Sequence, residues 1–384
     1  MKTILFLYPF HYGAPGFLNR VLPMGEALQS FGYSPLYLSV GYGKSPIFWP
    51  LKPGDKVNHS SSHFTSGLVR IPSELTQEVS SVLYFKLGRF FPPWFRALDV
   101  LVSLKAIQIE HKDLCAVICQ KPLFRTVFPS LSIANKLSIP AILDVDDYDI
   151  SSKAAFLKRF DAIMVASRTL EGIFSEWKPL FVPNVPRQAV DDFQSIESKA
   201  FNRGTLNTIF IYPGTGLPKG IARKVLDALI PKSHNHFLTL VGFPKAILEG
   251  YLALVPKNKL RVYPKLPNSE VLELLDWHDI SVCLDPNTRY GNSKSSIRLM
   301  ESMSKGLAIL SWSNGETGHI VSKSGCGRVV PYCDFESLRK EHLSLSINKS
   351  KLLICREKSI SYIRELPNWR SNVLDLASLL NGLV

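Results

Sequence analysis

Short apolar runs alternate with amphipathic segments along most of the chain, which is the pattern of an α/β protein. In the first half, strands are predicted at residues 3–8, 34–40, 114–120, 139–143 and 160–167, with helices at 17–31 and 170–177. The first helix is amphipathic and ends at Gly32. Strands separated by helices pair in parallel, so this half predicts a parallel sheet.

The second half repeats the pattern. Strands are predicted at residues 208–212, 237–241, 260–263, 280–284, 307–311 and 327–331, and helices at 221–230, 269–276, 297–305, 351–366 and 369–380. Residues 290–295 are predicted as a loop and residues 314–318 as a turn. Two halves of this kind predict two Rossmann-like domains, with parallel sheets that face each other across a cleft.

The domain boundaries follow from a change in composition. Residues 188–206 are polar and charged and contain no clear strand, so they are predicted to link a first domain at 1–187 to a second domain at 207–366. Residues 367–384 are predicted to form a carboxyl-terminal helix that crosses back to the first domain.

Composition narrows the class of protein. The 384 residues are 46% hydrophobic and 20% charged, so large cores are expected. The net charge of +13 favours anionic partners, but no run of five basic residues concentrates it, which argues against nucleic acid. Six cysteines without a CxxC pair are typical of reduced thiols in an intracellular protein.

Targeting signals do not change this assignment. The apolar amino terminus runs into His11 without a small-residue cleavage pattern, so it is interpreted as the first strand rather than a signal peptide. No apolar stretch reaches the roughly 18–20 residues that a membrane span needs. We expect a cytoplasmic protein that is soluble or peripheral at the inner membrane face.

The segment from Phe85 to Arg96 interleaves aromatic and basic residues around Pro92 and Pro93. An exposed segment of this kind suits an anionic membrane surface or a lipid-linked acceptor. The alternative interpretation is core packing of a kinked helix pair.

The stretch from Tyr290 to Leu310 carries the first candidate chemistry. A polar loop opens a helix, whose first amides lack intrahelical acceptors and attract anions. Lys294 and Arg298 add positive charge, and Glu301 lies inside the helix, where a carboxylate accepts sugar hydroxyls. Together they predict a nucleotide diphosphate site, although an ordinary αβ unit has the same pattern.

The second candidate is an acidic loop. Asp144, Asp146 and Asp147 follow an apolar strand, and carboxylates in such a place are solvated or bind something. Asp144 and Asp146 form a DxD pattern, which holds a divalent metal in some glycosyltransferases. We favour hydroxyl binding or acid–base chemistry over a metal, because no helper ligands are near in the sequence. A solvated turn is the remaining alternative.

The order of these elements over nearly the whole chain resembles the GT-B glycosyltransferases, specifically the retaining group 1 (family 4-like) type. The passage from Phe160 to Ser167, followed by Val182-Pro183-Asn184, looks like that family's strand and loop. The segment from Pro213 to Gly220 looks like its phosphate loop, and that from Leu299 to Gly306 like its donor helix.

The resemblance implies a reaction. A sugar would move from a nucleotide-diphosphate donor to a glycan or glycolipid acceptor, with retention of anomeric configuration and without a required metal. Lys219 would contact the donor diphosphate and Glu301 would accept the ribose hydroxyls. The other implied donor-binding residues are Gly214, Thr215, Asn292, Ser293, Lys294, Ser295 and Arg298. Gly13 and Gly16 would approach the diphosphate or acceptor together with Asp144. As a mechanistic hypothesis, one of Asp144, Asp146 or Asp147 would orient the acceptor or the developing oxocarbenium.

The sequence departs from the family pattern at three places. Ser293 occupies the place of a usual Glu, Thr215 stands near that of an Arg, and Gln120-Lys121 occupies that of an acceptor-side His. Lys294 or Arg298 could supply the lost positive charge. These departures leave two alternatives open: a nucleotide-sugar epimerase of the same fold, and a non-catalytic scaffold that binds a sugar nucleotide.

Overall fold

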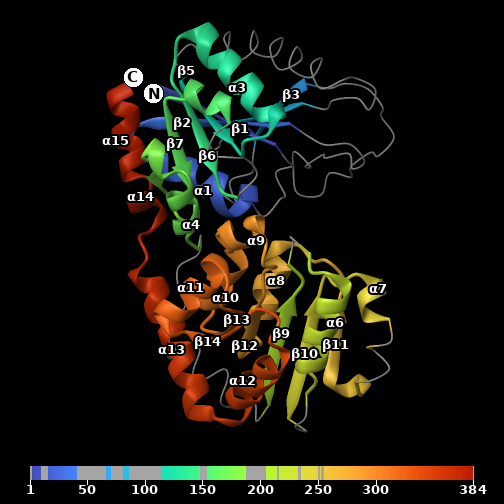
Figure 1. The fold of residues 1–384 in the computed structure, drawn as a ribbon. Coiled ribbons are helices and arrows are strands. Elements are labelled where there is room, and N and C mark those ends of the chain that lie inside the picture. The colour runs from blue at the N-terminus through green and yellow to red at the C-terminus, as the bar shows by residue number, and fades with distance from the viewer. Residues whose placement is uncertain are drawn as a thin grey trace. The chain divides into compact units, whose positions relative to one another are not determined.

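The chain forms two compact units in a computed structural model (Figure 1). The structure describes residues 2–9, 16–40, 66–70, 81–85, 114–147, 154–186, 205–213, 216–231, 235–249, 251 and 255–383. Unit 1 comprises Met1–Pro183 together with Pro367–Val384, and unit 2 comprises Asn184–Leu366. The carboxyl-terminal segment thus belongs to the same unit as the amino terminus.

Unit 1 is built on an eight-stranded sheet within the described residues, in the order β3-β4-β2-β1-β5-β6-β7-β8. Its strands are β1 (Lys2–Tyr8), β2 (Tyr33–Val40), β3 (Ser66–Arg70), β4 (Ser81–Phe85), β5 (Leu114–Gln120), β6 (Ala141–Val145), β7 (Ala162–Val165) and β8 (Leu180–Phe181). All neighbours pair in parallel except β3, which is antiparallel to β4. The β1 side chains from Ile4 to Tyr8 are buried, as expected of a strand covered on both faces.

Helices cover this sheet. They are a π-helical turn (Phe17–Val21) that continues into α1 (Leu22–Gln29), α3 (Phe124–Leu137), α4 (Arg168–Ile173), α14 (Trp369–Asn372) and α15 (Leu374–Leu383). The last two are held by polar contacts as well as packing. Tyr33 donates a hydrogen bond from its hydroxyl to Asn381 over 2.7 Å, and Asn372 donates to the Pro183 carbonyl over 2.7 Å.

Unit 2 is built on a six-stranded, wholly parallel sheet in the order β11-β10-β9-β12-β13-β14. Its strands are β9 (Leu206–Ile211), β10 (His236–Val241), β11 (Leu260–Tyr263), β12 (Ile280–Cys283), β13 (Ala308–Trp312) and β14 (Gly327–Val330). Counted within the unit, the strand order is 3-2-1-4-5-6, the doubly wound Rossmann order.

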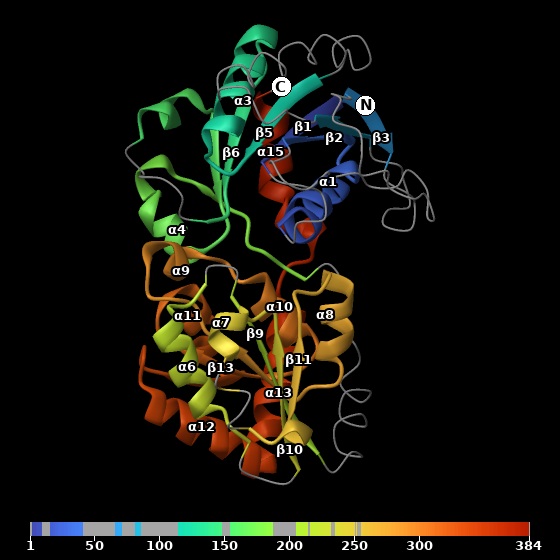
Figure 2. The same ribbon diagram turned by 90° about the vertical axis from the view of Figure 1, so that its right-hand side faces the viewer.

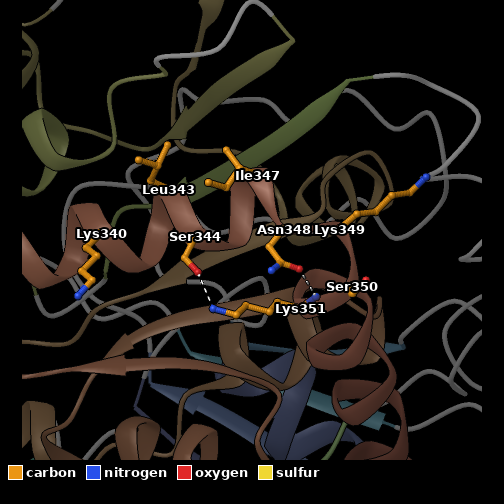
Figure 3. A pocket seen from close by; sticks show the side chains of 8 residues that line it. All are labelled: Lys340, Leu343, Ser344, Ile347, Asn348, Lys349, Ser350 and Lys351. Atoms are coloured by element: carbon orange, nitrogen blue, oxygen red, sulfur yellow. Dashed lines mark hydrogen bonds between the residues drawn. The ribbon is translucent and has the colours of Figure 1, made fainter.

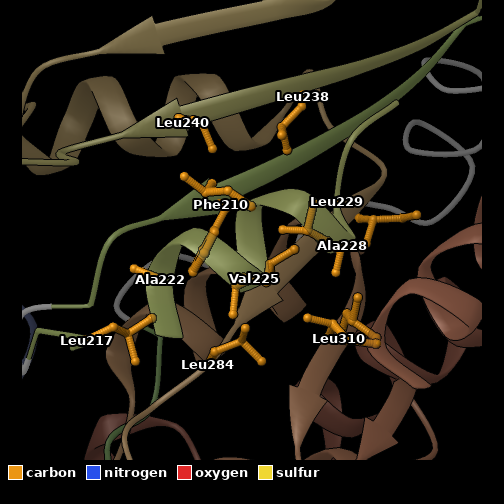
Figure 4. Close-up of a cluster of buried hydrophobic side chains, with 14 of the residues drawn as sticks. Phe210, Leu217, Ala222, Val225, Ala228, Leu229, Leu238, Leu240, Leu284 and Leu310 are labelled. Atoms are coloured by element: carbon orange, nitrogen blue, oxygen red, sulfur yellow. The ribbon is translucent and has the colours of Figure 1, made fainter. Parts of the chain in front are cut away.

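Helices cover both faces of the second sheet. They are α6 (Lys219–Ala228), α7 (Lys245–Leu248), α8 (Asn268–Leu275), α9 (Arg289–Ser293), α10 (Ile297–Ser304), α11 (Gly315–Ser324), α12 (Phe335–Ile347) and α13 (Lys349–Glu365). Successive residues of β9 point to opposite faces of the sheet. Phe210 packs with Val225 of α6 (Figure 4), whereas Ile209 packs with Val271 of α8. Helices α6 and α8 lie on opposite sides of the sheet (Figure 2). The apolar run from Ile209 to Ile211 in β9 is therefore explained by packing on both faces of the sheet.

The α/β class and the parallel sheets predicted from the sequence are confirmed, apart from the antiparallel edge strand β3, but two local predictions were wrong. Residues 314–318 are not a turn, because α11 begins at Gly315 and its buried Ile320 and Val321 hold it against the sheet. Residues 290–295 are not all loop, since α9 covers Arg289–Ser293. Of the aromatic and basic segment from Phe85 to Arg96, only Phe85 is described, as the last residue of β4, and the rest lies outside the described residues.

In the part of the chain that the structure describes, no helix is long and apolar enough to cross a membrane.

Candidate functional site

The carboxyl edge of the second sheet is where the chain leaves β9 and β12 in opposite directions, since β9 leads toward β10 and β12 toward β13. Such a switch point leaves a crevice outside the strand ends, which is the usual ligand position in doubly wound sheets. Two connections line it: residues 212–218 between β9 and α6, and residues 284–296 between β12 and α10.

The first connection delivers Lys219 to the start of α6. Tyr212 braces it, because its hydroxyl accepts a hydrogen bond from the Leu217 amide and donates one to the Leu217 carbonyl, both 2.9 Å long. Pro218 occupies the N-cap and no side chain caps the helix. Lys219 is exposed as the first helical residue, so an ammonium group and a helix start coincide here. Gly214 and Thr215 lie outside the described residues.

The second connection is a short helix followed by a capped longer one. Thr288 caps α9 by accepting a hydrogen bond from the Gly291 amide over 3.0 Å, and Ser296 caps α10 by accepting one from the Leu299 amide over 3.3 Å. Ser293 is buried and donates its hydroxyl to the Tyr290 carbonyl. The Ser293 hydroxyl therefore supports α9 itself.

The remaining predicted donor residues surround these caps. Ser295 is buried, and its carbonyl accepts a hydrogen bond of 3.1 Å from the side chain of Asn184. Lys294 is half-buried between the two helices. Glu301 is 8% exposed in the second turn of α10. The sequence placed these residues in a loop and in the helix after it, but it did not show that Asn292 and Ser293 belong to the short helix α9, which ends before Lys294.

Arg298 joins the ends of the two central strands. Its guanidinium donates to the Ile211 carbonyl over 3.0 Å and lies 3.4 Å from an Asp285 carboxylate oxygen. Asp285 also accepts a hydrogen bond of 3.0 Å from Thr317, in the first turn of α11. One buried carboxylate thus fixes the end of β12, the start of α10 and the start of α11 relative to one another.

A chain of amides runs beside this carboxylate. Asn314 donates to the Asn292 side chain over 2.8 Å, and Asn292 donates to the Asn287 side chain over 2.8 Å. Gly315 makes this approach possible, because a Cβ atom there would lie 2.6 Å from the Asn292 Cα, and its φ is +68°. Sequence reasoning missed Asn314 and Thr317, because it predicted a turn at residues 314–318. It assigned no role to Asp285, which follows a predicted strand.

Unit 1 has a polar cluster at the matching edge of its own sheet. Asp144 is fully buried and accepts a hydrogen bond of 2.8 Å from Arg20 Nε, with a second from the same guanidinium. Asp146 and Asp147 both form ion pairs with Lys121. Gly16 lies under the Tyr8 hydroxyl, where a Cβ atom would approach to 2.9 Å, and Gly13 lies outside the described residues.

Sequence reasoning identified the three aspartates but not the cations that neutralise them. Arg20 lies 124 residues from Asp144 in the sequence, so no local pattern could connect them. Lys121 carried a weak signal, because it directly follows an apolar strand. Among the described residues, no group of three or more His, Cys, Asp or Glu side chains is arranged to hold a metal ion.

A surface pocket lies elsewhere on unit 2, at the junction of α12 and α13 (Figure 3). It is lined by Lys340, Leu343, Ser344, Ile347, Asn348, Lys349, Ser350 and Lys351. The neighbouring His342 lies 3.0 Å from Thr208, near the start of β9. The pocket is therefore toward the amino end of the strands, away from the switch point, and is not part of the candidate site.

Two units of this topology define the GT-B class of fold, and comparison with solved structures agrees. A glycosyltransferase from Rickettsia africae ESF-5 superposes with a TM-score of 0.67 at 13% identity, covering 100% of this chain and 98% of that one. Anabaena Alr3699/HepE, solved in complex with UDP, gives 0.64 at 13% identity and covers 100% of each chain.

An epimerase has the same fold. A putative UDP-N-acetylglucosamine 2-epimerase from Listeria monocytogenes gives a TM-score of 0.60 at 10% identity, covering 100% of this chain and 95% of that one. No protein-family model matches the sequence, and no curated protein is similar to it by sequence. The comparisons therefore show the GT-B fold.

Proposed function

We propose that this protein is a retaining glycosyltransferase that moves a sugar from a nucleotide-diphosphate donor to a glycan or lipid-linked acceptor. One observation carries the proposal: the switch point of the second sheet combines the uncapped start of α6, the exposed Lys219 and the buried Glu301. A diphosphate needs amides and cations, whereas a ribose needs a hydrogen-bond acceptor. Solved proteins of this fold that bind UDP support the nucleotide class.

In the proposed reaction, the bond between the anomeric carbon and the donor phosphate breaks, and negative charge grows on the diphosphate. Lys219 and the first amides of α6 stabilise this charge, which is the usual largest contribution in such reactions. Gly214 and Thr215 belong to the same connection and are assigned to diphosphate binding. Glu301 accepts hydrogen bonds from the ribose hydroxyls.

The sugar and the phosphate nearest to it are assigned to the second connection, through Asn292, Lys294 and Ser295. Arg298 acts indirectly, because its guanidinium already holds Ile211 and Asp285. The cations and amides fill the role that a divalent metal has in other transferases, so none is assigned. For retention, the leaving phosphate takes the acceptor proton on the face from which it departs.

Acceptor binding is assigned to unit 1, with Asp146 and Asp147 as the residues that orient the acceptor, and Gly13, Gly16 and Asp144 are assigned to the same function. A lipid-linked acceptor would place the protein at the cytoplasmic face of a membrane. The net charge of +13 supports attraction to an anionic surface.

The test is Lys219→Ala with Lys245→Ala as a matched control. Both lysines are exposed first residues of helices that follow a proline, but Lys245 begins the short helix α7 and has no assigned role. We expect Lys219→Ala to lower sugar transfer by about a hundredfold or more, since one preorganised donor at a developing charge contributes on that scale. Normal turnover in Lys219→Ala, with unchanged thermal stability, would refute the assignment.

A nucleotide-sugar epimerase is the second candidate. A putative epimerase has the same fold over 100% of this chain, and Ser293 stands where the resembled family has a sugar-reading Glu. Incubation with the donor alone separates the two. An epimerase changes the donor sugar or releases it without any acceptor, whereas a transferase needs an acceptor for efficient turnover. Donor binding by calorimetry with no turnover on any acceptor would instead indicate a non-catalytic scaffold.

A further inference from the structure

Strands β1 and β5 of unit 1 end with their last side chains on one face of the sheet, and Asp144, the second-last residue of β6, shares that face. Leu7 of β1 is paired with Cys119 of β5, and Gln120 is paired with Asp144 of β6. Paired residues of a parallel ladder point to the same side of the sheet. Tyr8, Gln120 and Asp144 therefore share a face, which is the face that the first helical segment covers, since Tyr8 packs on Phe17 with ring centroids 5.4 Å apart.

One buried amide group on this face lacks a hydrogen-bond partner among the described residues. Gln120 is 1% exposed, and its Nε2 group makes no hydrogen bond within the described part of the chain. A buried amide donor without an acceptor is costly, so native proteins keep few of them. Asp146 Oδ1 is also buried, and although Lys121 Nζ is 2.8 Å away, it receives no well-directed hydrogen bond.

Lys121 directly follows Gln120 and has an unusual backbone. Its φ is +63°, in the left-handed region that a side chain other than glycine seldom adopts. Backbone contacts hold it there, because its amide donates to the Asp144 carbonyl over 2.9 Å and its carbonyl accepts from Thr126 Oγ1 over 2.7 Å. Such outliers persist where the surroundings enforce them, and they cluster at functional sites. The result is a buried ammonium group that touches both Asp146 and Asp147.

Four charged side chains influence the Asp146 carboxyl: Lys121, Asp147, Asp144 and Arg20. The pKa of Asp146 is raised to about 7: burial is the main cause, Asp147 and Asp144 also raise it, and Lys121 and Arg20 lower it. Burial also raises the pKa of Tyr8, so this side chain stays neutral. Arg20 is occupied by Asp144. Lys121 is therefore the strongest influence that keeps Asp146 ionised at neutral pH.

We propose that Lys121 is a positioning residue: it pairs with Asp146 and holds this carboxylate ionised, so that an acceptor hydroxyl can donate to Asp146 and accept from the amide of Gln120, the residue before Lys121. A hydroxyl group can donate to the Asp146 carboxylate oxygen and accept from the Gln120 amide, and neither atom has a hydrogen-bond partner among the described residues. The proposal rests on the proposed function for the identity of the ligand, a hydroxyl of the sugar acceptor. It adds Lys121 and Gln120 to the residues that sequence reasoning had selected.

The experiment follows the Asp146 carboxyl by carbon-13 NMR and the acceptor kcat/KM, both against pH. The titrated variants are Lys121→Met, Lys121→Arg, Asp147→Asn and Lys178→Met. Lys121→Met should move both midpoints upward by about one pH unit or more, because the opposing cation is lost. With a shift from pH 7 to pH 8, the ionised fraction at pH 7 falls about fivefold. Lys121→Arg keeps the charge and should restore the wild-type midpoint.

The variant Asp147→Asn keeps the proposal testable if Lys121→Met does not fold. It removes a neighbouring negative charge and leaves Lys121 in place, so the Asp146 midpoint should move toward acid. Lys178→Met is the matched control, since Lys178 is an exposed lysine of the same unit that also has a positive φ, of +46°. Its midpoint and its kcat/KM should equal those of the wild type.

The proposal is overturned if the Asp146 midpoint stays unmoved in both Lys121→Met and Asp147→Asn. It is also overturned if Gln120→Met leaves the acceptor KM unchanged while the donor KM is normal. The carboxyl titration needs no turnover. If the wild type binds no donor, the proposed function is refuted, and so is the assignment of an acceptor hydroxyl as the ligand. The titration then still tests whether Lys121 keeps Asp146 ionised.

Discussion

Two buried histidines of unit 2 make its stability sensitive to acid. His236 of β10 and His342 of α12 flank Thr208, with each Nε2 atom within 2.9 and 3.0 Å of the same hydroxyl oxygen. Burial lowers the pKa of His236 to about 4, with Lys259 adding to the effect. Burial likewise lowers the pKa of His342 to about 3, with His236 as the lesser cause.

The sign of the effect follows from the two states. The unfolded histidines take up protons below their ordinary pKa of about 6.5, whereas the folded ones stay neutral until pH 4 or lower. Unfolding therefore binds protons, and stability is lost as pH falls from about 6.5 toward 4. At pH 5 each histidine should cost about 2 kcal/mol relative to pH 7, and the two together about 4 kcal/mol.

The measurement should isolate unit 2, because unfolding of two compact units need not be a single transition. Hydrogen exchange of the β9 and β10 amides, corrected for intrinsic rates, reports the opening free energy of this sheet. We expect that free energy to fall by about 4 kcal/mol between pH 7 and pH 5 in the wild type. His236→Gln with His342→Gln should remove most of this dependence.

The control is His319→Gln, because His319 is an exposed histidine of the same unit. It should leave the pH dependence as in the wild type. If the double variant loses as much stability between pH 7 and pH 5 as the wild type does, the buried pair is not the cause and the reasoning is refuted.

Three further predictions concern the cluster, the site and the chemistry. Arg20→Met leaves Asp144 buried without its cation, so thermal unfolding should show a loss of about 3–5 kcal/mol, and a loss below 1 kcal/mol would contradict the pairing. Gly315→Ala places a Cβ atom against Asn292 at a positive φ and should destabilise by more than about 1 kcal/mol, whereas Gly172→Ala, in open space on a helix, should be neutral or stabilising. Excess chelator should leave the rate of sugar transfer unchanged, and a loss that Mn²⁺ restores would assign a metal to the reaction.

Much of the fold could be predicted because the signals are local. The apolar run of β5 marks its ends at Leu114 and Gln120, and both boundaries agree with the structure. Periodicity failed where a helix begins with turn residues, as α11 does at Gly315, and where a short helix such as α9 is set by the cap at Thr288. Helix α12 was not predicted, because polar and apolar residues alternate there without a wide apolar stripe.

The candidate site was only partly predictable, since its side chains are organised by distant partners. The sequence placed Lys219 in a loop before a helix predicted at 221–230, whereas α6 begins at Lys219 itself, and it placed Glu301 within the helix that follows Lys294. It gave no indication that Arg298 is held by Ile211, 87 residues away. In unit 1 it selected Asp144, Asp146 and Asp147 as an acidic loop, without the two cations that balance them.

The sequence by itself determined the alternation of strand and helix and the division into two α/β halves, because each depends on hydrophobic periodicity within one segment. Only the tertiary structure decided the strand order and thus the switch points, since pairing joins segments that are far apart in the chain. It also decided the charge state of the acidic loop: burial alone would neutralise Asp146, and the ammonium of Lys121 opposes this only because β5 and β6 are neighbours.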